Sequence, residues 1–118
     1  MISQEDLFGK CPYATTQKIL TGKWSIVILH LLSEKTYRFN ELQHQIPDVT
    51  QATLTKQLKH LEEYGLVIRT VYAQIPPKVE YTLSDIGLEF NRVLDSVRIW
   101  GDKYIQYNKL KRSNSPSS

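Results

Sequence analysis

Cysteine and histidine side chains offer the widest range of chemistry in this sequence, and they are few. The 118-residue chain has one cysteine, Cys11, and three histidines, His30, His44 and His60. The histidines do not form the H-E-x-x-H pattern of a zinc-binding helix, and one cysteine cannot supply a four-cysteine zinc site or an internal disulfide. The five glycines are scattered and form no phosphate-binding loop. We therefore expect no enzymatic activity and no metal or other cofactor.

Cys11 allows two interpretations. It precedes Pro12, a favoured first residue of a helix, so its thiol should lie at a helix N-terminus beside Lys10. The helix dipole and the lysine would both favour the thiolate, which makes Cys11 a candidate redox sensor. The alternative is a small buried residue with no redox role. With one cysteine in the chain, a disulfide would have to join two subunits or attach a small thiol.

A second group of residues has the composition of a DNA-recognition surface. Thr50 is a good N-cap and Gly65 a good C-terminal cap, which predicts a helix from Thr50 to Tyr64. Three leucines, at positions 54, 58 and 61, repeat at helical spacing and should be buried. The opposite face of the first turns contains no acid, and its side chains can contact base edges or phosphates: Gln51, Ala52, Thr53, Thr55, Lys56 and Lys59.

The segment before this helix predicts two further helices. Residues 24–34 are apolar nearly all round, so this helix should be central, and His30 should lie in the core or at an interface. Residues 39–46 form a second helix, which Pro47 ends. The short turn that leads to Thr50 completes a helix-turn-helix.

The segment after Gly65 predicts a β-hairpin. Residues 66–72 and 79–83 are rich in β-branched and aromatic residues and flank a proline-containing loop, as expected for two strands of a wing. Lys78 in this wing and Arg38 before the helix-turn-helix would flank the DNA groove and suit phosphate contacts.

The last part of the chain predicts one long helix, capped by Ser84 and roughly 25 residues long, which exceeds what a small domain needs to cover its core. Its apolar stripe predicts a homodimer interface, with a helix folded back on its own core as the alternative. A twofold dimer would place two recognition helices ~34 Å apart and favour a pseudo-palindromic operator in double-stranded DNA. The stripe consists of Phe90, Val93, Val97, Trp100 and Tyr104.

Composition limits the remaining possibilities. The chain is 41% hydrophobic and 23% charged, which is normal for one folded domain, and its net charge of +3 is by itself weak evidence for nucleic acid binding. No apolar run approaches the ~18–20 residues of a membrane helix, and the first residues do not have the pattern of a secretory signal. We expect a cytoplasmic protein without membrane contact. It should have an N-terminal extension over 1–10, one domain over 11–109 and a disordered tail over 110–118.

In this order and spacing, the residues resemble the HxlR family of bacterial winged helix-turn-helix transcriptional regulators. The resemblance runs roughly from Cys11 to Tyr107. It rests on motifs that include Cys11-Pro12, Gly22-Lys23-Trp24, Arg38-Phe39-Asn40-Glu41-Leu42, Tyr64-Gly65-Leu66-Val67 and Pro76-Pro77-Lys78-Val79-Glu80-Tyr81.

The resemblance implies a mainly α fold with a small β-hairpin, in the α+β class, with a long C-terminal dimerisation helix. It also implies a sequence-specific DNA-binding homodimer, with dimer contacts made by the N-terminal segment and the last helix. Some HxlR-like regulators sense electrophiles or oxidants through an N-terminal cysteine, which is the role that Cys11 would take. The effector and the regulated genes do not follow from the resemblance. The alternative function is a winged-helix module that binds protein and not DNA.

Overall fold

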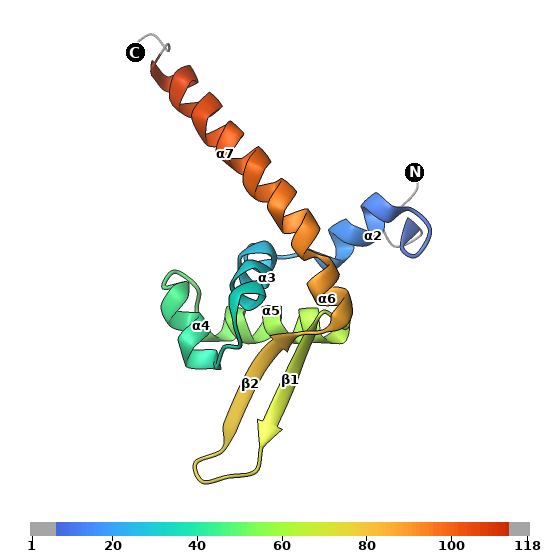
Figure 1. Ribbon diagram of the computed structural model, residues 1–118, viewed down its shortest axis with the longest axis vertical. Coiled ribbons are helices and arrows are strands. Elements are labelled where there is room, and N and C mark those ends of the chain that lie inside the picture. Colours follow the sequence, from blue (N-terminus) through green and yellow to red (C-terminus); the bar gives the residue numbers. More distant parts are fainter. Residues whose placement is uncertain (1–6, 114–118) are drawn as a thin grey trace.

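The structure, a computed structural model, describes residues 7–113 (Figure 1). Over residues 12–113, four helices are followed by a two-stranded antiparallel hairpin and two more helices. The bounds are α2 (Pro12–Ile19), α3 (Ser25–Glu34), α4 (Phe39–Gln45), α5 (Gln51–Glu63), β1 (Val67–Tyr72), β2 (Lys78–Leu83), α6 (Asp85–Glu89) and α7 (Asn91–Ser113). This is the element order of a winged helix-turn-helix with a long last helix, as predicted.

Helix α3 lies at the centre of the apolar core. Its Ile28 and Leu29 are fully buried, and α5 contributes three almost fully buried leucines to the same cluster. The hairpin adds the side chains at its base, including Val67 and Leu83. Burial of these aliphatic side chains is the main favourable term in folding of a domain of this size.

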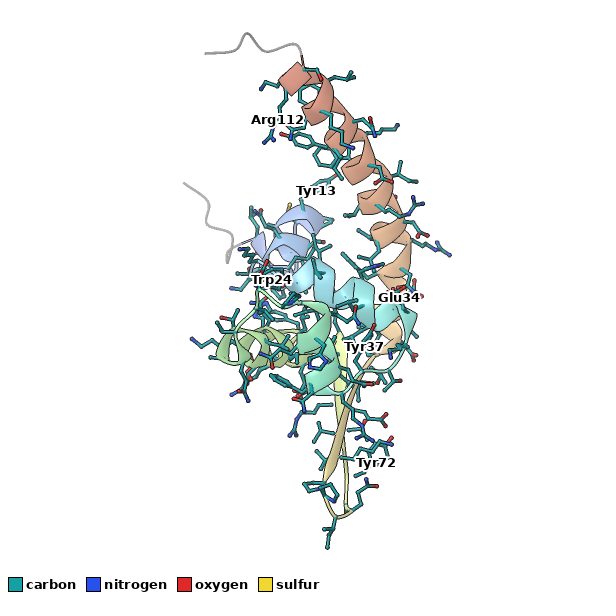
Figure 2. All side chains as sticks on the ribbon, turned by 90° about the vertical axis from the view of Figure 1, so that its left-hand side faces the viewer. Tyr13, Trp24, Glu34, Tyr37, Tyr72 and Arg112 are labelled. Atoms are coloured by element: carbon teal, nitrogen blue, oxygen red, sulfur yellow. The ribbon has the colours of Figure 1, made fainter. Side chains whose placement is uncertain are left out.

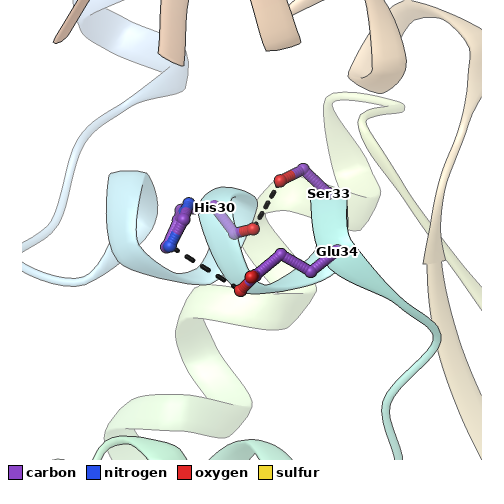
Figure 3. Close-up of polar contacts among 3 residues, drawn as sticks. All are labelled: His30, Ser33 and Glu34. Carbon is purple, nitrogen blue, oxygen red and sulfur yellow. Dashed lines mark hydrogen bonds and ion pairs between the residues drawn. The ribbon is translucent and has the colours of Figure 1, made fainter. Parts of the chain in front are cut away.

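The outer face of α3 differs from the prediction that the helix is apolar and central on all sides. Ile26 and Val27 are partly exposed, and the His30 side chain is more than half exposed. His30 Nε2 lies 3.7 Å from a carboxylate oxygen of Glu34, one turn later, and Ser33 Oγ donates to the His30 carbonyl (Figure 3). The prediction of a core position for His30 is therefore wrong, and the other predicted position, at an interface, stays a prediction. Glu34 gives the imidazole a polar partner at the surface, so His30 need not enter the core.

The hairpin is anchored to the helical body at its base. Val67 pairs with Leu83 there, and Tyr72 pairs with Lys78 at the far end. Tyr37 and Tyr81 exchange two backbone hydrogen bonds, which join the segment before α4 to β2. Because its outer half carries no such neighbour, the wing projects away from the body (Figure 1).

Three capping residues take the positions predicted for them. Thr50 Oγ1 accepts a hydrogen bond from the Thr53 amide at the start of α5, and Ser84 Oγ accepts one from the Gly87 amide at the start of α6. Gly65 has a φ of 81°, the left-handed conformation that glycine adopts without steric cost, and its amide donates to the Glu62 carbonyl. These local hydrogen bonds satisfy helix ends that would otherwise lack partners.

The last helix is interrupted, in contrast to the single helix predicted. Helix α6 ends at Glu89, and the Phe90 amide donates to the Gly87 carbonyl three residues earlier, which tightens the final turn. Helix α7 then starts at Asn91 and leaves the body in a new direction (Figure 1). The Phe90 side chain packs partly against the core at this point. The physical cause is the tight turn together with the anchoring of α6 on the hairpin base.

Helix α7 also continues beyond the boundary predicted for a disordered tail. It reaches Ser113, so residues 110–113 are helical, and the rest of the predicted tail lies outside the described residues. Leu110, Lys111 and Arg112 have good helix propensity, and cations in the last turn interact favourably with the helix dipole. The projecting helix contributes to the elongated shape, 60 × 37 × 26 Å. Figure 2 shows Tyr72 on the wing and Arg112 near the far end of α7, at opposite ends of the molecule.

Candidate DNA-binding interface

The predicted recognition helix is α5, and its two faces are separated as expected. Leu54, Leu58 and Leu61 are at most 1% exposed and hold the helix against the core. The other face is open to solvent over residues 51–59, and all six predicted contact residues lie there: Gln51, Ala52, Thr53, Thr55, Lys56 and Lys59. The two glutamates, Glu62 and Glu63, are confined to the C-terminal turn. An approaching phosphate backbone would therefore meet no carboxylate on the N-terminal half of this face.

Hydroxyl groups at the start of α5 are already oriented by hydrogen bonds. Thr50 Oγ1 donates to Thr53 Oγ1 at 2.9 Å, and Thr55 Oγ1 donates to the Gln51 carbonyl at 2.8 Å. Such bonds fix the side-chain rotamers before DNA arrives, which lowers the entropy lost on binding. The exposed methyl groups of Thr53 and Thr55 suit contacts with thymine methyls.

A polar contact on the inner side of α5 was not foreseen from the sequence. Ser25 is fully buried, and its hydroxyl donates to the Thr21 carbonyl and lies 3.0 Å from the Gln57 side-chain oxygen. Gly22 has a φ of 107°, and a Cβ atom there would lie 2.1 Å from the Gln57 side-chain nitrogen. The contact joins the start of α3 to the middle of the recognition helix. A glutamine between two buried leucine positions was the only signal for it in the sequence.

The two cations predicted to flank the DNA groove lie in different surroundings. Arg38 is exposed directly before α4, and its backbone amide donates to Glu41 at 2.8 Å. Lys78 is only partly exposed: its Nζ lies 3.7 Å from a Glu80 carboxylate oxygen and 5.0 Å from the centre of the Tyr72 ring. Arg69, on β1, is an exposed wing cation that the sequence analysis did not select. Strand alternation did not indicate it, because Arg69 lies two residues after the buried Val67 and residues two apart share one face of a strand.

The predicted dimer stripe lies on and just before α7. Val93, Val97, Trp100 and Tyr104 are exposed along the helix, whereas Phe90 sits at its base with part of its ring against the core. Trp100 stacks on Tyr104 with 5.5 Å between ring centres, and the indole is still 66% exposed. Tyr107 and Leu110 extend the apolar surface toward the end of the helix. Over its outer turns α7 therefore presents an aromatic surface that its own protomer leaves uncovered.

Helix α2, which follows Cys11, has no buried residue and rests on the C-terminal end of α5. His60 Nε2 lies 2.9 Å from the Ile19 carbonyl oxygen, so the imidazole donates to it, and Phe8 packs edge-on against Tyr64. Cys11 is the N-cap residue of α2, is partly exposed and is a free thiol. Figure 2 shows Tyr13, in the first turn of α2, pointing away from the body.

A groove of about 610 Å³ lies between α3 and α7. Ile26, Val27 and Leu94 give it an apolar floor, and the His30 and Arg98 side chains stand at its sides. In residues 7–113, no group of three His, Cys, Asp or Glu side chains could hold a metal ion. Over the same residues, no helix combines the length and the apolar character needed to cross a membrane.

Comparison with known proteins gives these features a family. The HxlR-like helix-turn-helix model matches residues 19–109. The HTH-type transcriptional regulator YdeP of Bacillus subtilis is 43% identical over 99 residues, which cover 84% of this chain and 77% of YdeP. An HTH-type transcriptional regulator of Halalkalibacterium halodurans is 45% identical over 93 residues, which cover 78% of this chain and 82% of that protein.

Solved structures agree with the sequence matches. The redox regulator HypR in its reduced form superposes with a TM-score of 0.79 at 34% identity, covering 84% of this chain and 98% of that one. The reduced form of the transcriptional regulator YodB from B. subtilis gives a TM-score of 0.71 at 33% identity, covering 80% of this chain and 93% of that one.

The predicted fold class and the DNA-binding regulator function are thereby confirmed, and the alternative of a protein-binding module is not supported. Both relatives are HTH-type transcriptional regulators. With a recognition helix, a wing and a long last helix in the order of its relatives, the chain belongs to the HxlR-like helix-turn-helix family of transcriptional regulators.

Proposed function

We propose that this protein regulates transcription in the bacterial cytoplasm by binding, as a homodimer, a pseudo-palindromic operator through the N-terminal half of α5. The observation that carries this proposal is the exposed, acid-free face of α5, held rigidly against the core by three leucines. Gln51 and Thr53 are placed to meet base edges, whereas Lys56 and Lys59 can meet phosphates or guanine. Arg38 would contact the backbone at the side of the groove, with Lys78 in a supporting role on the wing.

The test separates base contacts from phosphate contacts. Duplexes selected by the wild-type protein from a random double-stranded library serve as the probe in gel-shift assays at several salt concentrations. Lys59→Ala should weaken binding to all selected duplexes and, for a phosphate contact, reduce the salt slope by about one unit. Gln51→Ala should instead change the selected sequence. Glu63→Ala, on the last turn of the same helix, is the matched control and should leave the sequence preference unchanged.

The assignment of α5 fails if the folded Lys56, Lys59, Gln51 and Thr53 variants all bind like the wild type. Circular dichroism of each variant establishes that it is folded. Because the four side chains are exposed, their replacement by alanine removes no core contact.

The second part of the proposal is the dimer, formed through Phe90, Val93, Val97, Trp100 and Tyr104. Exposed aromatic side chains on a projecting helix are characteristic of association surfaces, where tryptophan and tyrosine contribute most of the binding energy. Sedimentation should give a mass near twice that of the chain. Trp100→Ala should shift the equilibrium toward monomer and weaken operator binding with it. A wild-type monomer at micromolar concentration that binds the operator at full affinity would refute this part.

A separate observation favours a redox input at Cys11. YodB, which is 33% identical to this chain, has been solved in a reduced and in a diamide-treated form. The redox regulator HypR has been solved in its oxidised and its reduced form. In this chain Cys11 is a partly exposed free thiol at the start of α2, and α2 contacts the recognition helix. Oxidation by diamide would remove one hydrogen atom from each of two thiols, reduce diamide to its hydrazine, and form a disulfide between two subunits.

The redox proposal predicts that diamide produces a covalent dimer on a non-reducing gel and lowers operator affinity. Dithiothreitol should reverse both effects, and Cys11→Ser should abolish both. The groove between α3 and α7 offers a place for a different, small-molecule input. If Cys11→Ser still loses operator affinity on diamide treatment, the input does not act through this thiol.

A further inference from the structure

The tip of the wing has an unusual composition for a surface near DNA. The loop between β1 and β2 has the sequence Ala73-Gln74-Ile75-Pro76-Pro77, every residue of it is exposed, and none of it is charged. Ile75 is 101% exposed, more than any other large hydrophobic side chain in residues 7–113. Because Ile75, followed by two prolines, is fully exposed to solvent, its side chain contributes no hydrophobic burial to the stability of its own chain.

Lys78, the wing cation closest to the tip, already interacts with neighbouring side chains and is not free to bind phosphate with its full charge. Lys78 has its ammonium group 3.7 Å from Glu80 and over the Tyr72 ring, so its charge is partly compensated at the base of the loop. Pro76 and Pro77 lack amide hydrogens and cannot donate to phosphate oxygens. Contact of the tip with DNA would therefore be made mainly by apolar atoms.

The position of the tip relative to α5 fits the spacing of the DNA grooves. The hairpin extends from the C-terminal end of α5, away from the body (Figure 1). Six residues of strand span about 20 Å at ~3.3 Å per residue. Along one face of B-DNA the major and minor grooves alternate, and about 17 Å, half of a ~34 Å turn, separates the centre of one groove from the centre of the next. With α5 in the major groove, the wing is long enough to reach the neighbouring minor groove.

We propose that Ile75 is a specificity-determining residue that enters the minor groove beside each half-site and partly unstacks a base step there. Apolar side chains such as isoleucine and proline act as wedges of this kind in proteins that bind the minor groove. The cost of unstacking depends on the step, and pyrimidine–purine steps such as TA are the most easily deformed. The wedge would make the protein prefer such a step outside the bases that α5 contacts. This inference rests on the proposed DNA-binding function and adds a second, shape-based component to it.

The experiment uses duplexes selected by the wild-type protein and varies only the flanks. In one series a flanking TA step is replaced by GC. In a second series, 2,6-diaminopurine replaces adenine in the flank, which adds an amino group in the minor groove and leaves the major-groove edge of the base intact. Wild-type affinity should fall about tenfold in each series, the size of one disfavoured base pair. With Ile75→Ser the ratio between favoured and disfavoured flanks should fall to within about twofold, while the preference for the central bases remains.

Two controls match this variant. Ile68→Ala removes an exposed aliphatic side chain from the base of the same hairpin, where Ile68 pairs with Thr82, and should keep the flank ratio of the wild type. Lys59→Ala should weaken binding to all flanks alike. Because Ile75 is fully exposed, Ile75→Ser removes no core contact, and equal thermal midpoints should show that it is folded.

The outcomes separate this inference from the proposed function. If the wild type enriches no sequence, the proposed function fails, and the wedge fails with it. If the wild type selects an operator and Ile75→Ser keeps the full flank ratio, only the wedge is refuted, and the exposed tip would then serve contact with a protein. A stacking probe supports the wedge directly: permanganate oxidation of the flanking thymine, which increases when the base is unstacked and needs no added minor-groove group, should rise on binding of the wild type and stay low with Ile75→Ser.

Discussion

Gly87 offers a sharp test of how the hairpin positions the end of the domain. It is a buried residue of α6 with ordinary helical geometry, so on helix propensity alone Gly87→Ala should stabilise the protein by about 1 kcal/mol. A Cβ atom at this position would, however, lie 2.3 Å from the Leu66 carbonyl oxygen and 3.3 Å from the Leu83 Cβ. Side-chain carbons do not approach a backbone oxygen within 3.0 Å, so at least 0.7 Å of movement, the difference between 3.0 and 2.3, is required.

The oxygen that must move already has a structural role. Leu66 O accepts the Ser84 amide at 2.9 Å and lies 3.2 Å from Ser84 Oγ, which joins the base of β1 to the cap of α6. Overpacking of a buried site costs about 1–3 kcal/mol, and a weakened hydrogen bond costs about 1 kcal/mol more. These costs exceed the propensity gain, so we expect Gly87→Ala to lower the free energy of unfolding by about 2 kcal/mol.

The measurement is thermal unfolding followed by circular dichroism at equal protein concentrations, because association stabilises the folded state. A loss of about 2 kcal/mol should lower the midpoint by about 10 °C. Leu88→Ala, at the next position of α6, is the control: Leu88 is half exposed, so the substitution should have a smaller effect. A midpoint for Gly87→Ala equal to or above that of the wild type would show that α6 can move away from the hairpin, and would refute the account of the helix break given above.

Three further predictions follow from other contacts. Gly22→Ala should destabilise the protein by about 1–2 kcal/mol because Gly22 has a left-handed backbone conformation. The double variant Gly22→Ala/Gln57→Ala should lose less stability than the sum of the two single variants, since Gln57→Ala removes the side chain with which the new Cβ atom clashes. A double-mutant cycle of urea unfolding measures the difference, and strict additivity would contradict the prediction. Thr50→Ala should cost about 1 kcal/mol through loss of the α5 cap, whereas Thr36→Ala, an exposed residue outside any helix, should be nearly neutral in the same assay. The hydrogen bond and negative charge of Glu80 raise the pKa of Tyr72 above 10.0, so absorbance titration should show a late tyrosine that Glu80→Gln moves down. The favourable interaction is fully present below pH 10.0 and is lost as pH rises through the raised pKa, and an unchanged titration in Glu80→Gln would exclude Glu80 as the cause.

The features that could be predicted from the sequence are those fixed by local interactions. Thr50, Gly65 and Ser84 act on amides and carbonyls a few residues away, so their types alone locate the ends of α5 and the start of α6. The leucine spacing likewise determines which face of α5 is buried and which is exposed to solvent.

The features that could not be predicted depend on contacts between distant segments. The helical spacing of apolar residues continues through Phe90, so the local sequence does not indicate the break that separates α6 from α7. The approach of Gly87 to Leu66 joins residues that are 21 positions apart, and the contact of Ser25 with Gln57 joins residues 32 positions apart. Such pairs become visible only when the hairpin and α3 are placed in space.

Because α2 packs on the C-terminal end of α5, the predicted recognition helix has two separate surfaces, one near its N-terminus and one at its last turn. Residues 51–59 of α5 carry the exposed side chains that face outward, whereas His60, in its last turn, contacts Ile19 of α2. If the proposed DNA contacts and the proposed input at the N-terminal segment hold, substitutions that change the operator sequence and substitutions that change the response to the signal would fall on different turns of one helix. Gene duplicates of such a regulator can drift to a new operator while keeping an old signal, or acquire a new signal while keeping their target genes. A short rigid helix thus lets two properties evolve independently within a chain of 118 residues.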